Sequence, residues 1–118
     1  MTQHDPGVTL RQMLDYARGI ADLIRGRSRS ELEQNFEFQW AVLRGLEILG
    51  EAANRLHEDF HARYPMIPWR QMIGMRNRLV HGYENVNLNA VWTAAIERVP
   101  PLIAELERVI PEWPIAED

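Results

Sequence analysis

Apolar residues recur along most of this chain at spacings of three and four, which place side chains on one face of an α-helix. The first such run covers residues 10–24 and stops before Gly26. A second run follows Ser30, whose position three residues before Glu33 predicts a capping box, and it continues as far as Pro65. The pattern therefore predicts a helix over 10–24 and an unusually long second helix over 31–63.

Two further helices are predicted in the second half of the chain. Pro68 suits the first turn of a helix, and Gly82 suits the position just past its end. Asn87 can cap a last helix running to about residue 110, which Pro100 and Pro101 should kink or divide. No segment shows the strict alternation of a half-buried strand. We therefore predict an all-α protein, an antiparallel up-and-down bundle of four to five helices.

The length and apolar content indicate how this bundle is organised. A chain of 118 residues that is 46% hydrophobic can form one compact domain and is too short for two ordinary ones. We expect a single domain over residues 1–118. Its core is predicted to contain Leu14, Phe36, Leu43, Leu46, Leu49, Ile73, Trp92 and Leu102.

Composition excludes several kinds of chemistry. The chain has no cysteine, which excludes thiolate metal sites and cysteine nucleophiles, and no lysine, which excludes Schiff-base chemistry. No apolar run approaches the roughly 20 residues of a membrane span, and the first residues do not resemble a signal peptide, so a cytoplasmic location without membrane association is expected. The formal net charge of −4 argues against nonspecific nucleic-acid binding by the whole surface.

Positive charge is nevertheless concentrated in one segment. No acidic residue occurs between Asp59 and Glu84, and this interval contains four arginines. On a helical wheel of roughly 100° per residue, polar residues of the predicted third helix fall on one side, and they include Arg70, Asn77, Arg78, and His81 at the helix end. Arg70 and Arg78 are therefore candidates for contacts with the phosphates of a nucleic acid.

Arg76 does not follow this division, because it projects from the apolar face of the same helix. An unpaired guanidinium would be costly there, so it requires a partner or an interface. Glu47 and Glu51 lie one turn apart among apolar residues of the second helix. We predict that Glu51 or Glu47 supports Arg76.

These residues allow a structural and a catalytic interpretation. In the structural one, Arg76 forms an ion pair, His81 is favoured by the helix dipole, and Arg78 is solvated. In the catalytic one, His81 transfers a proton, Arg76 neutralises a phosphate and Asn77 orients the scissile group. RNA cleavage of this kind needs no metal, because the 2′-hydroxyl is an internal nucleophile. The reaction is accelerated by both a general base and a general acid, and one copy of this helix supplies only one histidine. A twofold dimer that juxtaposes two copies of the helix would supply the second histidine.

The run Arg76-Asn77-x3-His81-Gly82-Tyr83 resembles the arginine, four residues, histidine, one residue, tyrosine signature of the HepT-like HEPN ribonucleases. These are the toxin halves of bacterial type VII toxin–antitoxin pairs. The segments "LRGLEILGEAANRL", "YPMIPWRQMIGMRNRLVHGY" and "VNLNAVWTAAIERVPPLIAELE" are also similar to the family core in order and spacing. The resemblance covers nearly the whole chain and is weakest over the first 30 residues.

The resemblance implies a homodimer with a composite cleft that cleaves RNA without metal or cofactor. Arg76 and His81 match the catalytic pair, and Asn77 matches the polar residue that follows the arginine. Tyr83 matches the tyrosine that the partner antitoxin, a minimal nucleotidyltransferase (MntA), modifies with AMP to silence the toxin. An adenylate two residues from His81 would place anionic bulk where the RNA phosphate must lie.

Two other functions are compatible with the sequence. "HEDFH", residues 57–61, matches the H-E-x-x-H motif, in which His57 and His61 could bind zinc and Glu58 could act as general base. No obvious third ligand accompanies this pair. Alternatively, the chain could be a non-enzymatic adaptor of a nucleotidyltransferase, since the same surface would serve both roles.

Overall fold

The computed structural model describes residues 5–82 and 86–115, and every regular element in these ranges is helical. The α-helices are α1 (Pro6–Ile24), α2 (Arg29–Gln34), α3 (Phe36–Arg55), α4 (Glu58–Arg63), α5 (Trp69–His81), α6 (Leu88–Thr93) and α7 (Val99–Val109). A π-helical segment, η2 (Ala94–Arg98), joins α6 to α7, and a 3-10 turn, η3 (Ile110–Glu112), follows α7. The prediction of an all-α fold is confirmed.

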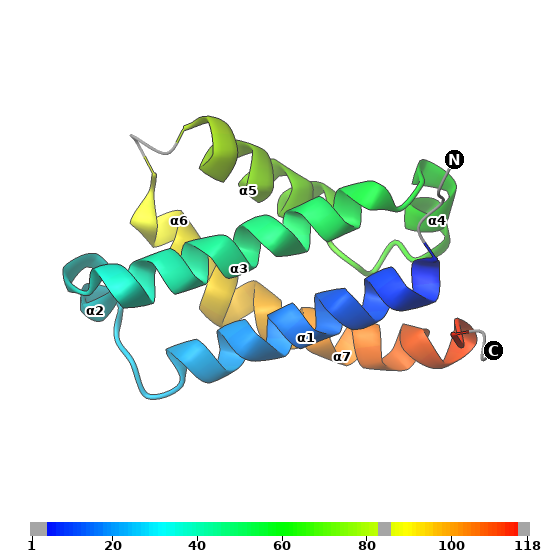
Figure 1. Cartoon of the computed structure of the whole chain (residues 1–118), viewed down its shortest axis with the longest axis horizontal. Coiled ribbons are helices and arrows are strands. Elements are labelled where there is room, and N and C mark those ends of the chain that lie inside the picture. The colour runs from blue at the N-terminus through cyan, green and yellow to red at the C-terminus, as the bar shows by residue number, and fades with distance from the viewer. Residues whose placement is uncertain (1–4, 83–85, 116–118) are drawn as a thin grey trace.

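Helix α3 is the centre of an antiparallel bundle (Figure 1). It packs against α1 on one side and α5 on the other, and α1 also packs against α7. Successive long helices run in opposite directions, while α2 and α4 lie at opposite ends of the molecule. The start of α1 and the end of the bundle are joined where Arg11 donates to the Trp113 carbonyl over 2.9 Å. No helix in the described ranges is long and apolar enough to cross a membrane.

The predicted long helix over 31–63 is wrong as a single element, because two interruptions divide it into α2, α3 and α4. At Asn35 the backbone is extended, and the side chain accepts a hydrogen bond from the Phe38 amide over 3.0 Å to start α3. At His57 the side-chain Nδ1 accepts from the Asp59 amide over 3.2 Å and starts α4. Side chains that satisfy free amides at helix starts thus outweigh the continuous apolar pattern.

The first interruption also corrects one predicted core residue. Because α3 starts after Asn35, its register turns Phe38 into the core, where it is 3% exposed. Phe36 is 66% exposed and stacks on Trp40 with ring centroids 6.0 Å apart. Four of the other predicted core residues are buried: Leu14, Leu46, Leu49 and Leu102. The remaining three are half-buried and pack against the core: Leu43, Ile73 and Trp92.

The prediction that Pro100 and Pro101 kink or divide the last helix agrees with the structure, in which α6 and α7 are separate elements and the prolines lie in the first turn of α7. Neither proline can donate a backbone hydrogen bond, so a regular α-helical ladder cannot continue through them. The chain forms the π-helical segment η2 directly before them, and the Val99 amide donates to the Ala94 carbonyl, five residues back. Asn87 caps α6 as predicted, with its Oδ1 accepting from two amides.

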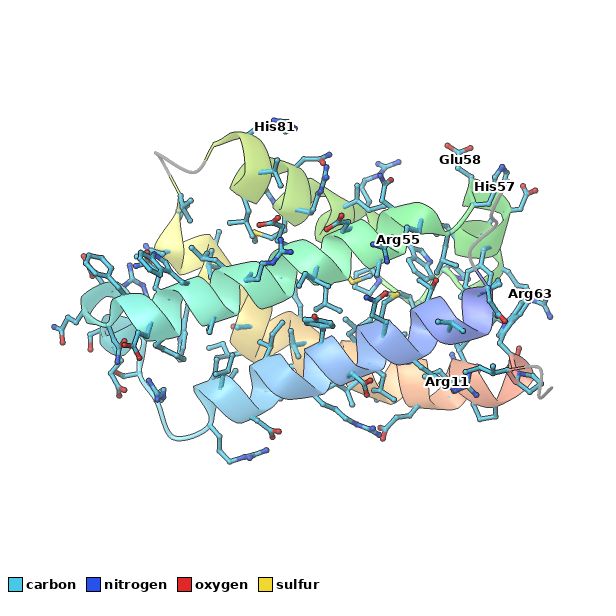
Figure 2. All side chains as sticks on the ribbon, in the orientation of Figure 1. Arg11, Arg55, His57, Glu58, Arg63 and His81 are labelled. Carbon is cyan, nitrogen blue, oxygen red and sulfur yellow. The ribbon has the colours of Figure 1, made fainter. Side chains whose placement is uncertain are left out.

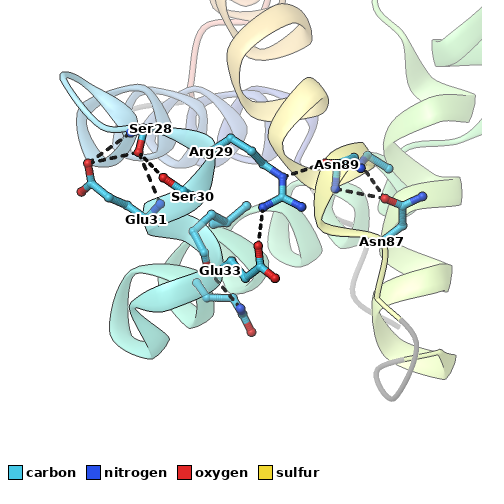
Figure 3. A network of polar contacts seen from close by, with 10 residues as sticks. Ser28, Arg29, Ser30, Glu31, Glu33, Asn87 and Asn89 are labelled. Atoms are coloured by element: carbon cyan, nitrogen blue, oxygen red, sulfur yellow. Dashed lines mark hydrogen bonds and ion pairs between the residues drawn. The ribbon is translucent and has the colours of Figure 1, made fainter.

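The capping box of α2 lies two residues earlier than predicted (Figure 3). Ser28 is the N-cap, its hydroxyl accepts from the Glu31 amide, and the Glu31 carboxylate accepts from the Ser28 amide. Glu33, the expected partner of Ser30, instead accepts from Arg29, which also donates to Asn89 of α6 over 2.7 Å. Both serines fit the sequence pattern, and the earlier one is used.

Replacing the two serines separately tests this assignment. Ser28→Ala removes the N-cap acceptor and should lower the free energy of unfolding by about 1 kcal/mol. Ser30→Ala should change it by less than about half of that, because Ser30 accepts no amide in the described structure. Urea denaturation of both variants compares them directly, and a larger loss in Ser30→Ala would contradict the assignment.

Candidate functional site

Helix α5 carries most of the predicted site and lies on the outside of the bundle against α3 (Figure 1). Trp69, Met75 and Leu79 are its buried residues. Arg70, Asn77, Arg78 and His81 are exposed, as the helical wheel predicts. The basic side chains Arg78 and His81 occupy the last turn, where cations interact favourably with the helix dipole.

Gly50 allows α5 to approach α3 closely at the position of Arg76. A Cβ atom placed on Gly50 would lie 2.3 Å from the Arg76 Cβ and 2.4 Å from the Met72 carbonyl oxygen. The second of these atoms belongs to the backbone of α5, so it cannot move without shifting the helix. Because Gly50 has no side chain, the Arg76 Cβ can lie directly against the α3 backbone.

The Arg76 guanidinium is held between the core and the exposed face. Its Nε is buried and has no hydrogen-bond partner among the described residues, while Nη1 donates to the Asn77 Oδ1 over 3.1 Å. With its oxygen turned toward Arg76, the Asn77 amide leaves its two N–H donors for another group. Asn77 also lies one helical turn before His81, on the same face of α5. Asn77 thus contacts the Arg76 guanidinium and lies on the same face of α5 as His81.

The predicted ion pair of Arg76 with Glu47 or Glu51 is not formed within the described part of the chain. Glu47 is bound by Arg44 of its own helix, with Nη1 and Oε1 2.8 Å apart. Glu51 is half-buried and takes part in no described ion pair with Arg76. A carboxylate three residues along a helix reaches a flexible arginine more easily than one on a neighbouring helix reaches a guanidinium that packing holds in place. A supporting role for Glu51 stays a prediction.

His81 is the last residue of α5 and lies at the free end of this helix (Figure 2). A hollow of about 610 Å³ between the end of α5 and the start of α6 is lined by Asn77, Arg78 and His81 on one side and by Asn87 and Val91 on the other. Polar and cationic groups therefore share one hollow with room for a ligand. Tyr83, the predicted site of modification, lies outside the described residues.

The rival H-E-x-x-H motif does not form a helical metal pair. His57 precedes α4 as its N-cap, and His61 is within the helix. The His61 Nε2 donates to the Ala53 carbonyl over 2.8 Å, and its ring stacks on Trp69 at 4.4 Å between centroids. Within the described ranges, no group of three histidine, aspartate or glutamate side chains could hold a metal ion. These contacts favour a structural role for His61.

Sequence reasoning missed the contribution of Gly50. Gly50 lies inside a strongly apolar helical pattern, where glycine lowers helix stability by about 1 kcal/mol relative to alanine. A glycine at such an unfavourable position was the available sign of a close helix–helix contact. It also missed Met75, which is 6% exposed and packs beneath the site. Met75 was not among the predicted core residues, although it faces the core.

The fold and the position of the polar helix define the class of the protein, an all-α bundle with its candidate site on α5. Residues 13–109 match the model of the family described as "HepT-like: Ribonuclease HepT-like". The chain therefore belongs to the HepT-like ribonuclease family, as the resemblance of its motif predicted.

Proteins of two archaea illustrate the relationship. The chain is 34% identical over 110 residues to "Putative RNase MJ0127" of Methanocaldococcus jannaschii, covering 93% of this chain and 91% of that protein. It is 36% identical over 102 residues to "Probable ribonuclease HepT" of Thermococcus cleftensis, covering 80% of this chain and 93% of that protein. No solved structure matches the chain significantly.

The close approach at Gly50 predicts unequal effects of alanine at two buried glycines of α3. Gly50→Ala should lower the free energy of unfolding by about 1–3 kcal/mol, because the new methyl group meets the α5 backbone. Gly45→Ala is the comparison, since its Cβ would lie 2.8 Å from Cγ1 of the buried Ile20 side chain and would meet no backbone atom. Gly45→Ala should lower the free energy of unfolding by less than Gly50→Ala does, because the Ile20 side chain can repack whereas the α5 backbone cannot, and because alanine favours the helix. Equal stability of Gly50→Ala and the parent protein in urea denaturation would contradict this account.

Proposed function

We propose that this chain is a metal-independent endoribonuclease, the toxin of a type VII toxin–antitoxin pair, with Arg76 and His81 as its catalytic residues. One observation carries the proposal: the Arg76 guanidinium bonds to Asn77 beside the face of α5 that ends in His81. Membership of the HepT-like family supports ribonuclease activity, and the names of the related proteins agree with it.

The arrangement suits transfer of a phosphoryl group within RNA. The 2′-hydroxyl oxygen attacks the adjacent phosphorus, the bond to the 5′-oxygen of the next nucleotide breaks, and a 2′,3′-cyclic phosphate is left. A general base takes the 2′-hydroxyl proton, and a general acid protonates the departing 5′-oxygen. Arg76 stabilises the added negative charge on phosphorus, and the Asn77 amide donates to a phosphate oxygen and orients it.

A homodimer supplies the second histidine. On an α-helix, Arg76 and His81 leave the axis about 140° apart and about 7.5 Å apart along it, so they do not share one face of α5. Helix α5 also contains only one histidine, so one protomer offers a single histidine of this helix for the two proton transfers. Two copies of α5 that meet near their C-terminal ends would place both histidines at a composite cleft, one as base and the other as acid.

Regulation is proposed at Tyr83, two residues after His81 in the sequence. A minimal nucleotidyltransferase antitoxin would transfer AMP from ATP to its hydroxyl, with pyrophosphate as the leaving group. The phosphate of that adenylate would repel the RNA backbone from the cleft. The second candidate function, a non-enzymatic partner of the nucleotidyltransferase, would use the same surface. It differs by predicting no RNA cleavage by the purified protein.

His81→Ala is the direct test of catalysis. Loss of a positioned acid–base group should lower the cleavage rate about 10²–10⁴-fold, while the helical circular dichroism spectrum stays unchanged because His81 is exposed. The melting temperature should fall only slightly, since the interaction with the helix dipole is the stabilising contact that is lost. Cleavage of single-stranded RNA by the unmodified protein should persist in EDTA.

The matched control is His57→Asn, which replaces another exposed histidine, beside α4 and away from His81, with a residue that caps helices well (Figure 2). It should cleave at the parent rate. Loss of activity in His57→Asn or in EDTA would favour the zinc hydrolase, and undiminished cleavage by His81→Ala would refute the catalytic assignment.

Tyr83→Phe separates regulation from catalysis. It removes only the hydroxyl that would carry AMP. In the presence of the nucleotidyltransferase and ATP, the variant should therefore cleave RNA at the rate of the unmodified parent protein, whereas the parent protein should lose activity. Mass spectrometry of the parent protein should show one added adenylate on Tyr83, and the variant should show none. An adenylate on the Tyr83→Phe protein would disprove this choice of residue.

A further inference from the structure

A second hollow extends from the candidate site along the other half of α5. It is an open groove of about 900 Å³ between α4, the loop that follows α4, and the outer face of α5. The lining residues used below are His61, Met66, Arg70, Ile73, Gly74 and Asn77. We call this surface the α4–α5 groove. We infer that the α4–α5 groove binds the nucleotides that flank the scissile bond of a single-stranded RNA.

The groove is continuous with the candidate catalytic site. Asn77 lines both the α4–α5 groove and the hollow that contains His81. From Asn77 the groove follows α5 back to Gly74 and then to Arg70, which covers about 10 Å along the helix axis. A polynucleotide with a phosphate beside Asn77 can thus lie along α5 without leaving the surface.

Gly74 leaves the middle of this groove open. It is an interior residue of α5, where glycine costs about 1 kcal/mol relative to alanine. A Cβ on Gly74 would meet no atom within 4 Å, so packing inside the protomer does not require glycine there. Unlike Gly50, which fits against α3, Gly74 exposes bare helix backbone to a ligand that approaches from outside.

The charge of the groove is complementary to a phosphate backbone. Arg70 is exposed on its wall and forms no described ion pair. Glu58 is the acidic residue of the lining and lies at the α4 end, away from Asn77. Positive charge therefore lies nearer to the candidate site than negative charge does, which favours a strand that enters along Arg70.

The groove also offers apolar surface to bases. Met66 is 70% exposed, and Ile73 is only half-buried. A single strand can turn its bases onto such side chains while its phosphates face Arg70, whereas the bases of a duplex are paired and inaccessible. This combination favours single-stranded RNA over double-stranded RNA. The inference rests on the proposed ribonuclease function and adds the location and class of the substrate.

Filling the groove tests the inference. Gly74→Met adds a flexible side chain and should raise the KM for a short single-stranded oligoribonucleotide by about tenfold, with kcat changed by less than about twofold, because the scissile bond itself is not displaced. Arg70→Ala should weaken RNA binding and reduce the slope of log affinity against log salt by about one.

Gly19→Met is the matched control. Gly19 is also an interior helix glycine with no atom within 4 Å of an added Cβ, and it lines a separate hollow of about 430 Å³ on α1 and α3. It should leave both KM and kcat at the parent values. An unchanged KM in Gly74→Met would overturn the inference, as would an equal increase in Gly19→Met.

Two further outcomes separate the groove from the proposed function and from dimer formation. If the parent protein binds the oligoribonucleotide without cleaving it and Gly74→Met weakens that binding, the groove is supported and the ribonuclease is refuted. If Gly74→Met converts a dimer into a monomer in sedimentation equilibrium, the groove holds a second copy of the chain, and the inference is wrong.

Discussion

The direct contact between the backbones of α3 and α5 at Gly50 is the constraint on which the candidate site depends. A side chain at Gly50 would separate the two helices and move every residue that α5 presents to solvent. Because the Met72 carbonyl and the Arg76 Cβ lie where that side chain would begin, α5 has little freedom to slide or rotate on α3. The position of Arg76 is thus fixed at its own Cβ, and the positions of Asn77 and His81 are fixed by packing on the opposite side of α5.

This packing leaves Arg76 with an energetic cost. A buried N–H without a partner costs about 1–3 kcal/mol, and Nε of Arg76 has none among the described residues. A site that binds a phosphodiester can accept such a cost, since a guanidinium held in place before binding needs no reorganisation in the transition state. In the proposed function Asn77 serves the same purpose, because its bond to Nη1 orients both side chains.

The sequence predicted helix α5 and its exposed face closely, because periodicity, a proline before it and a glycine after it all agree. It failed at Asn35 and His57, where a single capping side chain interrupts an apolar pattern that is otherwise continuous. The placement of Phe36 in the core was wrong for the same reason, since a new helix start changes which residue faces inward. The pairing of Arg76 with a glutamate depended on the relative position of two helices, which sequence spacing does not determine.

The central claim, that two copies of α5 provide one site with two histidines, can be measured in mixed dimers. Parent and His81→Ala chains are refolded together in known ratios, and the rate of RNA cleavage is plotted against the fraction of parent chain. If both histidines are needed, activity follows the square of that fraction, so an equal mixture retains about a quarter of the parent activity. A linear dependence, with about half of the activity in an equal mixture, would show that each protomer acts alone and would contradict the account.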